Sequence, residues 1–351
     1  MSQAPSTARP APLKLRVGDV VQVKSREEIL ATLTADGTLD EMPFMPEMLA
    51  FAGKHLTVEK RAHKTCDTLE WTGLLSIDDT VHLAGARCTG AVHGGCQAAC
   101  QIFWKEAWLK KVPASGAPAN DRAEAVPAAV CTEASLDAAT QQAPAEGDTE
   151  VRYRCQATDL RKFGKEMSAW NLMQFVRDIQ SGNATVSATL KGIGWRVFRW
   201  TNAHFRAYRL QHAVFNQIQR MRGGMINIQL AGPHVKTPKE TLDLAIGERV
   251  QVKGVEEIRD TLNVEQRNRG LYFDKEMQPY CNRTYEVGAR VTQIIEEKTG
   301  RMMKLPGDCI IMKGVHCTGR YHKNCPRASP SYFREIWLRR TDAPLSGKLP
   351  W

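Results

Sequence analysis

The stretch Gly18-Asp-Val-Val-Gln-Val-Lys24 decides the architecture, because it recurs 229 residues later as Gly247-Glu-Arg-Val-Gln-Val-Lys253. The register between the two stretches then holds without a gap for about 90 positions, which indicates an internal repeat. Residues that recur at equivalent positions are Glu47/Glu276, Cys88/Cys317, His93/His322, Cys96/Cys325, Glu106/Glu335 and Trp108/Trp337. The sequence therefore predicts two copies of one domain, residues 15–112 and 244–342.

Each copy begins with features that are typical of a small β-rich domain. A glycine-acidic turn is followed by an alternating run, at Val20–Lys24 and at Val250–Lys253, and such a run predicts a short strand. Ser25 lies three residues before Glu28, as in a capping box, so we expect a short helix over 27–33. Further strands are expected at 56–60, 81–83, 107–112, 285–287, 310–312 and 336–339. These patterns predict an α+β chain with an SH3-like barrel in each copy.

The segments outside the two copies differ in composition. Residues 1–14 are predicted to be disordered, and 343–351 to form a tail. Residues 113–150 are rich in alanine, proline and acidic residues and have almost no aromatic ones, so they are predicted to be a flexible linker. Residues 151–240 are predicted to be a basic and largely helical segment.

The positive charge of the chain is concentrated in that helical segment. The 351 residues carry a net charge of +10, and 160–239 contain 13 Lys/Arg against 2 Asp/Glu. Apolar side chains recur at helical spacing, and several arginines fall off this stripe: Arg196, Arg199, Arg206, Arg209 and Arg220. Residues 187–222 are therefore a candidate surface for nucleic acid or for an anionic membrane. The alternative is a helix that packs its stripe on a barrel and exposes arginine to water.

Composition also bears on location. No run of about 18 apolar residues occurs, so no transmembrane segment is expected. The first residues lack the apolar core of a secretory signal peptide, so we expect a cytoplasmic protein. In that compartment ten cysteines indicate metal ligands or reactive thiols rather than disulfides.

The cysteines carry the strongest chemical signal. Both copies contain Cys-x4-His-x2-Cys, at Cys88–Cys96 and at Cys317–Cys325, and each copy adds two cysteines at positions that the other lacks. Four thiolates per copy predict a tetrahedral zinc site or an iron–sulfur cluster. The predicted ligands are Cys66, Cys88, Cys96 and Cys100 in the first copy and Cys281, Cys309, Cys317 and Cys325 in the second. Candidates for additional ligands are His93, His322, Cys155 and His63, whereas Cys131 is expected to be an unliganded thiol.

Five segments carry a resemblance to a family of uncharacterised bacterial proteins. They begin at Arg61 (RAHKTCDT), His93 (HGGCQAAC), Phe103 (FWKEAWL), Cys325 (CPRA) and Arg334 (REIWL). The resemblance covers most of the chain outside 113–150 and implies a bacterial, cytoplasmic protein with two cysteine-rich SH3-like repeats, but it lends no activity. Ala52 departs from the family, which tends to carry cysteine there.

Three hypotheses of function follow. The first is a metal-binding tandem-repeat protein with two sites that acts as an adapter or scaffold, alone or with a protein partner. The others are an iron–sulfur redox accessory protein of a biosynthetic pathway and a nucleic-acid-binding protein. Signatures of phosphate-binding loops, dinucleotide folds, zinc proteases and serine hydrolases are absent, so an enzyme is not favoured. The recurring acids Glu47/Glu276 and Glu106/Glu335 are expected to satisfy backbone donors or to pair with arginine.

Overall fold

A computed structural model describes residues 12–113, 128–204 (without 145, 146, 148 and 169), 213, 214, 217, 221 and 230–347. The chain forms two compact units. The first contains residues 1–96, 100–184 and 295–302, and the second contains 97–99, 185–294 and 303–351. Most of the predicted disordered N-terminus, 1–14, and part of the predicted tail lie outside the described residues.

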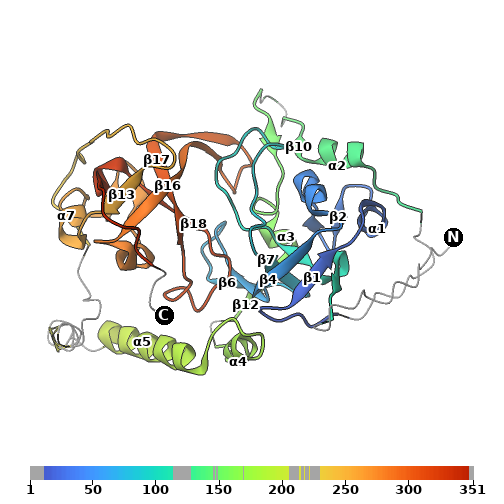
Figure 1. Ribbon diagram of the computed structural model, residues 1–351, viewed down its shortest axis with the longest axis horizontal. Coiled ribbons are helices and arrows are strands. Elements are labelled where there is room, and N and C mark those ends of the chain that lie inside the picture. Colours follow the sequence, from blue (N-terminus) through green and yellow to red (C-terminus); the bar gives the residue numbers. More distant parts are fainter. Residues whose placement is uncertain are drawn as a thin grey trace. The chain divides into compact units, whose positions relative to one another are not determined.

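The first unit is built on a five-stranded antiparallel sheet (Figure 1). Its strand order is β8-β7-β4-β1-β9, and β1, between β4 and β9, pairs Val21 with Leu56 on one side and with Lys111 on the other. The strands are β1 (Val20–Val23), β4 (His55–Arg61), β7 (Thr80–Leu83), β8 (Trp104–Lys105) and β9 (Leu109–Lys111). Smaller sheets are formed by β2 (Thr38–Leu39) with β3 (Met42–Pro43), by β5 (Lys64–Cys66) with β6 (Leu74–Ser76) and β12 (Lys165–Met167), and by β10 (Gln141–Gln142) with β11 (Arg152–Tyr153).

Short helices connect these strands. The capping box that the sequence predicts is confirmed at the start of α1 (Arg26–Leu30), where Ser25 Oγ accepts from the Glu28 N–H and the Glu28 carboxylate accepts from the Ser25 N–H. The 3-10 helix η1 (Pro46–Phe51) buries Met48 and Leu49. The remaining helices of this unit are η2 (Glu106–Trp108), α2 (Glu133–Ala139), α3 (Leu160–Phe163) and α4 (Met173–Gln180).

The predicted linker 113–150 differs from the expectation where it is described. Residues 133–139 form α2, whose N-terminus is capped by the Thr132 hydroxyl, which accepts from the Ser135 N–H at 3.1 Å. Leu136 and Cys131 are both 1% exposed and belong to the core of the first unit. Two buried apolar side chains and a cap are enough to order this stretch despite its overall polar composition.

One glutamine from beyond the first copy completes its core. Gln156 is buried, and its side chain bonds both main-chain groups of Phe103: Oε1 accepts from the N–H at 2.8 Å and Nε2 donates to the carbonyl at 2.9 Å. Nε2 also donates to the Pro43 carbonyl at 3.0 Å. The Gln156 side chain thus makes the hydrogen bonds that a neighbouring strand would otherwise make with the main-chain N–H and carbonyl of Phe103.

The second unit repeats this architecture. Its sheet has the order β18-β17-β16-β13-β19, and Val250 pairs with Tyr285 and Arg340, which are the equivalents of Leu56 and Lys111 at the 229-residue offset. The strands are β13 (Arg249–Val252), β16 (Thr284–Ile295), β17 (Met302–His316), β18 (Pro330–Phe333) and β19 (Leu338–Arg340), with a hairpin of β14 (Arg267–Asn268) and β15 (Leu271–Tyr272). The helices include α5 (Val186–His204), α7 (Val255–Arg259), η3 (Lys275–Tyr280) and η4 (Glu335–Trp337).

Equivalent side chains hold both sheets together. Trp108 donates its indole N–H to Thr32 at 3.1 Å, and Trp337 donates to Thr261 at 2.9 Å. The chain is thus a mixed α and β protein made of small antiparallel sheets. The SH3-like barrel is not confirmed, because the described strands of each main sheet form an open series and no closed barrel is found among them.

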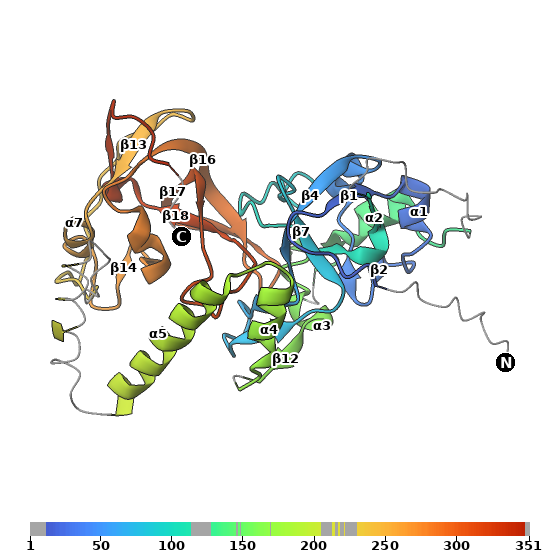
Figure 2. The same cartoon turned by 60° about the horizontal axis from the view of Figure 1, so that its bottom comes forward.

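Among the described helices, none combines the length and the apolar character needed to cross a lipid bilayer. The longest, α5, is continuous in Figure 2, and the Thr185 hydroxyl caps its N-terminus by accepting from the Ala188 N–H at 3.1 Å.

Candidate metal centres

The structure brings one glutamate, one cysteine and one histidine together in each unit. The first group is Glu47, Cys88 and His93, and the second is Glu276, Cys317 and His322. Within each group the candidate ligand atoms all lie within 4.8 Å of one another. The three positions are equivalent at the 229-residue offset, so the repeat contains the same group twice.

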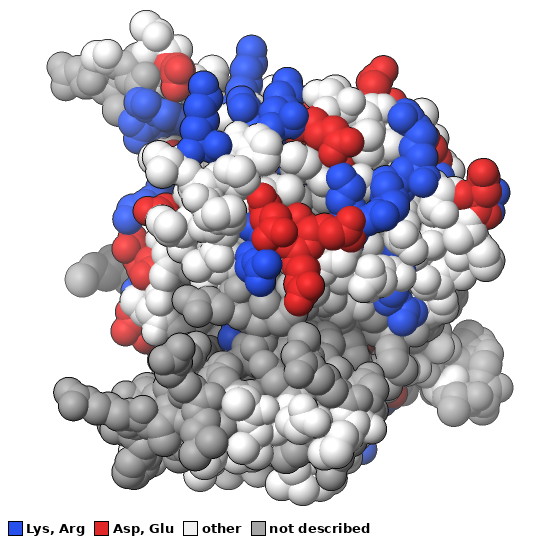
Figure 3. Space-filling view, turned by 90° about the vertical axis from the view of Figure 1, so that its left-hand side faces the viewer, with Lys and Arg blue, Asp and Glu red and all other residues white. Residues whose placement is uncertain are grey.

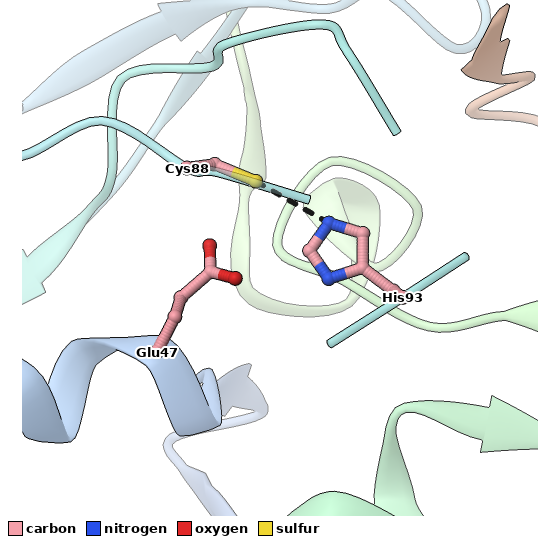
Figure 4. A group of neighbouring side chains, drawn as sticks. All are labelled: Glu47, Cys88 and His93. Carbon is pink, nitrogen blue, oxygen red and sulfur yellow. Dashed lines mark hydrogen bonds between the residues drawn. The ribbon is translucent and has the colours of Figure 1, made fainter. Parts of the chain in front are cut away.

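Three separate elements supply the first group (Figure 4). Glu47 projects from η1, Cys88 follows β7, and His93 lies in the turn after Cys88. Cys88 Sγ lies 3.3 Å from His93 Nε2. Zinc–sulfur and zinc–nitrogen bonds of about 2.3 and 2.0 Å place such atoms about 3.5 Å apart around one tetrahedral ion. The observed separation is therefore close to what a shared ion requires.

The loop that carries the histidine needs glycine. Gly90 has φ 72°, and a Cβ atom at this position would lie 1.8 Å from the Cys96 carbonyl oxygen. The equivalent Gly319 also has φ 72°, with the Cys325 carbonyl oxygen 2.2 Å from a Cβ. Both distances are shorter than any side chain can tolerate, so glycine is required in both copies.

The first group contains a buried carboxylate that lacks hydrogen bonds. Both carboxylate oxygens of Glu47 and Nδ1 of His93 are buried without a hydrogen-bond partner. Burying a charge without a partner is costly, and a cation bound between these side chains would remove that cost. This observation points to a positively charged ligand at the first group.

Burial determines the protonation states there. It raises the pKa of the Cys88 thiol well above its usual value, and the neighbouring Glu47 carboxylate raises it further. Burial also lowers the pKa of His93. Without a metal the pair is therefore a neutral thiol beside a neutral imidazole. A catalytic cysteine needs the opposite, a thiolate beside a protonated histidine, so the geometry does not favour a cysteine nucleophile.

The second group satisfies its own polar atoms. Glu276 accepts from the N–H groups of Thr318, at 3.1 Å, and Tyr321, at 2.6 Å, and from the Thr318 hydroxyl. His322 Nε2 lies 3.2 Å from Asp274, whose carboxylate raises the pKa of His322. Burial and then Glu276 raise the pKa of Cys317. The two groups thus share ligand types and differ in how their carboxylates are compensated.

The predicted four-cysteine sets differ from these two groups in composition. Neither group contains a second cysteine, and the part of the chain that the structure describes includes all ten cysteines, each without a disulfide. Cys66 lies on β5 opposite Leu74, Cys281 ends η3, and Cys309 lies on β17. Within the predicted sets, Cys100 lies close enough to Cys88, and Cys325 to Cys317, to add to the effect of burial in raising the pKa of these thiols.

The remaining predicted ligands belong to neither Glu-Cys-His group and make other contacts. The carbonyl of Cys100 accepts from the Cys88 N–H at 2.9 Å, Cys96 Sγ accepts from the Ile295 N–H, and the Cys325 N–H donates to the His322 carbonyl at 3.1 Å. Burial raises the pKa of Cys155 to about 11. His63 is buried 3.3 Å from Asp178, which also accepts from Lys64.

Sequence reasoning did not propose Glu47 or Glu276 as candidate ligands. It expected them, like Glu106 and Glu335, to satisfy backbone donors or to pair with arginine, and this is confirmed for Glu276, Glu106 and Glu335 but not for Glu47. Glu106 accepts from the Leu15 N–H at 2.9 Å and from Arg61 at 2.6 Å, and Glu335 accepts from the Leu244 N–H at 3.1 Å and from Arg290 at 2.9 Å. The signal that was available was the recurrence of a glutamate in both copies together with Cys-x4-His.

The candidate polyanion surface is described only in part. Arg206, Arg209 and Arg220 lie outside the described residues, as do the side chains of Arg196 and Arg199. On α5 the apolar side chains are largely exposed: Val186, Leu190, Ile193, Val197 and Trp200. Leu190 is 63% and Val197 55% exposed, so this part of the stripe is not packed in a core.

Comparison with protein-family models, with curated proteins and with solved structures found no similar protein.

Proposed function

We propose that this protein binds two transition-metal ions, one per repeat, and that zinc is the physiological metal. The observation that carries the proposal is the recurrence of glutamate, cysteine and histidine at equivalent positions of both units. All three residue types are zinc ligands, and three protein ligands leave a fourth position for water or for another donor. The ions would stabilise each repeat, and the protein would act as an adapter or scaffold.

The single cysteine in each group favours an ion over a cluster. An iron–sulfur cluster is held by four thiolates as a rule, whereas a mixed set of thiolate, imidazole and carboxylate suits one zinc ion. The iron–sulfur hypothesis therefore has less support from the geometry than the zinc hypothesis.

Metal analysis of the full-length protein tests the proposal. We expect about two zinc ions per chain, colourless protein, and a lower unfolding temperature after chelation. Glu47→Gln should reduce the zinc content to about one, and Glu47→Gln with Glu276→Gln should reduce it further. Unchanged metal content in both variants, or two clusters with visible absorbance, would contradict the zinc proposal.

A second candidate function rests on the exposed stripe of α5. Val186, Leu190, Ile193, Val197 and Trp200 follow alternating spacings of four and three residues and so lie along one side of the helix. No acidic residue occurs from 179 to 239, whereas lysines and arginines are frequent there. We propose that α5 lies on an anionic lipid surface, since a helix with an apolar side and basic surroundings binds at such an interface.

Among the described residues, no observation supports the nucleic-acid hypothesis as the exposed apolar side of α5 supports lipid binding. On the face shown in Figure 3, the lysine and arginine side chains lie in separate groups around a cluster of acidic side chains. The described part of that face therefore carries no continuous basic surface of the kind that tracks a phosphate backbone. Binding of nucleic acid through 187–222 stays a prediction.

A further inference from the structure

A buried arginine of the second unit has no acidic partner. Arg334 is 5% exposed, and its guanidinium donates to main-chain carbonyl oxygens and also contacts the Cys309 thiol. The acceptors are the carbonyls of Asn268 at 3.4 Å, Arg269 at 2.8 Å, Asp308 at 3.3 Å, and Gly307. Among the described residues no carboxylate oxygen forms an ion pair with it. A buried positive charge that lacks a counter-ion is unusual, because desolvation is then uncompensated.

In the first unit the cation at the equivalent position has an acidic partner. The equivalent of Arg334 is Lys105, which is 3% exposed and pairs with Asp40 at 3.0 Å. The equivalent of Asp40 in the second unit is Arg269. The second copy therefore has a second cation where the first copy has the counter-ion.

The backbone at this position makes arginine an unfavourable choice. Asp40 and Arg269 are each the first residue of the two-residue turn of a hairpin, with φ of 50° and 48°. Aspartate tolerates this left-handed conformation well, whereas arginine does not. The side chain of Arg269 donates from Nη2 to the Pro306 carbonyl at 3.2 Å, which holds it over this part of the second unit.

The two guanidinium groups lie close together. A Cβ atom on Gly307 would lie 3.2 Å from Arg334 Nη1 and 3.6 Å from Arg269 Nε. Both groups thus border the same small space, and glycine at 307 keeps that space free of a side chain. Two neighbouring guanidinium groups repel each other, and an anion between them would relieve that repulsion.

A cavity opens beside these groups. Its volume is about 120 Å³, and Lys239, Arg269, Arg290 and Arg334 contribute the cations of its lining. The acidic residues of the lining are already paired with cations, two of them with Arg290 of the same lining. Glu335 and Asp308 each accept from Arg290 at 2.9 Å, and Glu240 pairs with Lys253 at 2.9 Å. Lys239 and Arg269 form no ion pair among the described residues, and Arg334 adds its positive charge although most of its donors are bonded to carbonyls. The volume suits one phosphate-sized group.

We propose that this cavity binds a tetrahedral oxyanion, either free phosphate or the phosphate group of a monoester. Guanidinium and ammonium groups bind such anions through charge-assisted hydrogen bonds. The site lies in the second copy alone, because Asp40 occupies the corresponding position of the first. It is separate from the candidate metal centres and does not depend on them.

Charge reversal at the turn tests the proposal. Full-length protein is titrated calorimetrically with inorganic phosphate at low ionic strength, with chloride at matched ionic strength as the reference. We expect one saturable site per chain. Arg269→Asp recreates the aspartate of the first copy and should weaken phosphate binding at least tenfold. Because it also supplies a counter-ion for Arg334, its unfolding temperature without phosphate should not fall, which shows that the variant is folded.

A matched variant separates this site from general electrostatics. Arg267→Asp makes the same change of charge two residues away, at an exposed side chain outside the cavity lining. It should leave phosphate binding within twofold of the natural protein. Equal losses in both variants, or no phosphate binding beyond that of chloride, would overturn the proposal. Titration with phosphoserine distinguishes the two sources: tighter binding than phosphate indicates a monoester, and weaker binding indicates the free ion.

Discussion

Cys88 Sγ lies 3.3 Å from Nε2 of His93, whereas Cys88 and Cys96, which the sequence pairs in one motif, do not share a group. The distinction matters because the two cysteines lead to different ligand sets. One set contains four thiolates, and the other contains a thiolate, an imidazole and a carboxylate.

The two sets predict different effects of removing a single thiol. We expect Cys88→Ser to lose about one zinc ion per chain and Cys96→Ser to retain both, because Cys96 does not belong to the group of three. The measurement is metal content by mass spectrometry after dialysis against a fixed zinc concentration. Cys131→Ser is the control for loss of a buried thiol. Equal loss in the Cys88 and Cys96 variants would support the four-cysteine set.

The two glutamates should respond in opposite ways to neutralisation in metal-free protein. Glu47 lacks the N–H and hydroxyl donors that Glu276 has, and its polar neighbour is the Cys88 thiol, so Glu47→Gln removes a poorly compensated buried charge and should raise the free energy of unfolding by about 1–3 kcal/mol. Glu276 accepts from two N–H groups and a hydroxyl, so Glu276→Gln should lower it by on the order of 2 kcal/mol. Denaturant titrations in the presence of a chelator measure both changes. Destabilisation by Glu47→Gln would show that its carboxylate has partners after all.

Glu335 should contribute to stability against acid. Burial opposes ionisation, but the N–H groups of Leu244, Leu242 and Asp243 together with Arg290 hold the pKa of Glu335 below its usual value. A lowered pKa in the folded state adds stability above the unfolded pKa of about 4.3, and this stability is lost as the pH falls through the folded value. Glu335→Gln should therefore unfold more easily at pH 7, by about 2 kcal/mol, and lose less stability than the natural protein between pH 5 and pH 3. Parallel acid-induced profiles for both proteins would contradict this role.

An aromatic residue on α5 offers a test of lipid binding. Trp200 is 55% exposed on the apolar side of α5, and Trp71 is 81% exposed in the first unit. Trp200→Ala should weaken binding to phosphatidylserine vesicles roughly tenfold, since burial of a large apolar side chain contributes about 1.5–3 kcal/mol. Trp71→Ala should have no effect. Cosedimentation at low salt measures both, and retention by RNA rather than by vesicles would favour the nucleic-acid hypothesis instead.

The sequence predicts most strongly what both copies share. The recurrence of Val20–Lys24 and the capping box of Ser25 depend on local spacing, and both are found where they are expected. Glu47 was not predicted as a candidate ligand because it lies on η1, 41 residues before Cys88, and only the fold brings the two together. Residues 113–150 were predicted to be a flexible linker from their average composition. Average composition does not reveal a short capped helix such as α2, which begins after Thr132.

The contact between Gln156 and Phe103 has a consequence for the newborn chain. The first copy is complete as a sequence once residue 112 has been synthesised, but the peptide group of Phe103 finds its side-chain partner only after Gln156 has left the ribosome. Until then the main-chain N–H and carbonyl of Phe103 lack these hydrogen bonds, so we expect that the first copy does not reach its final packing. Folding of the first copy is therefore expected to depend on residues that follow it in the chain, and a fragment that ends at residue 112 should fail to reach the packing of the full-length protein.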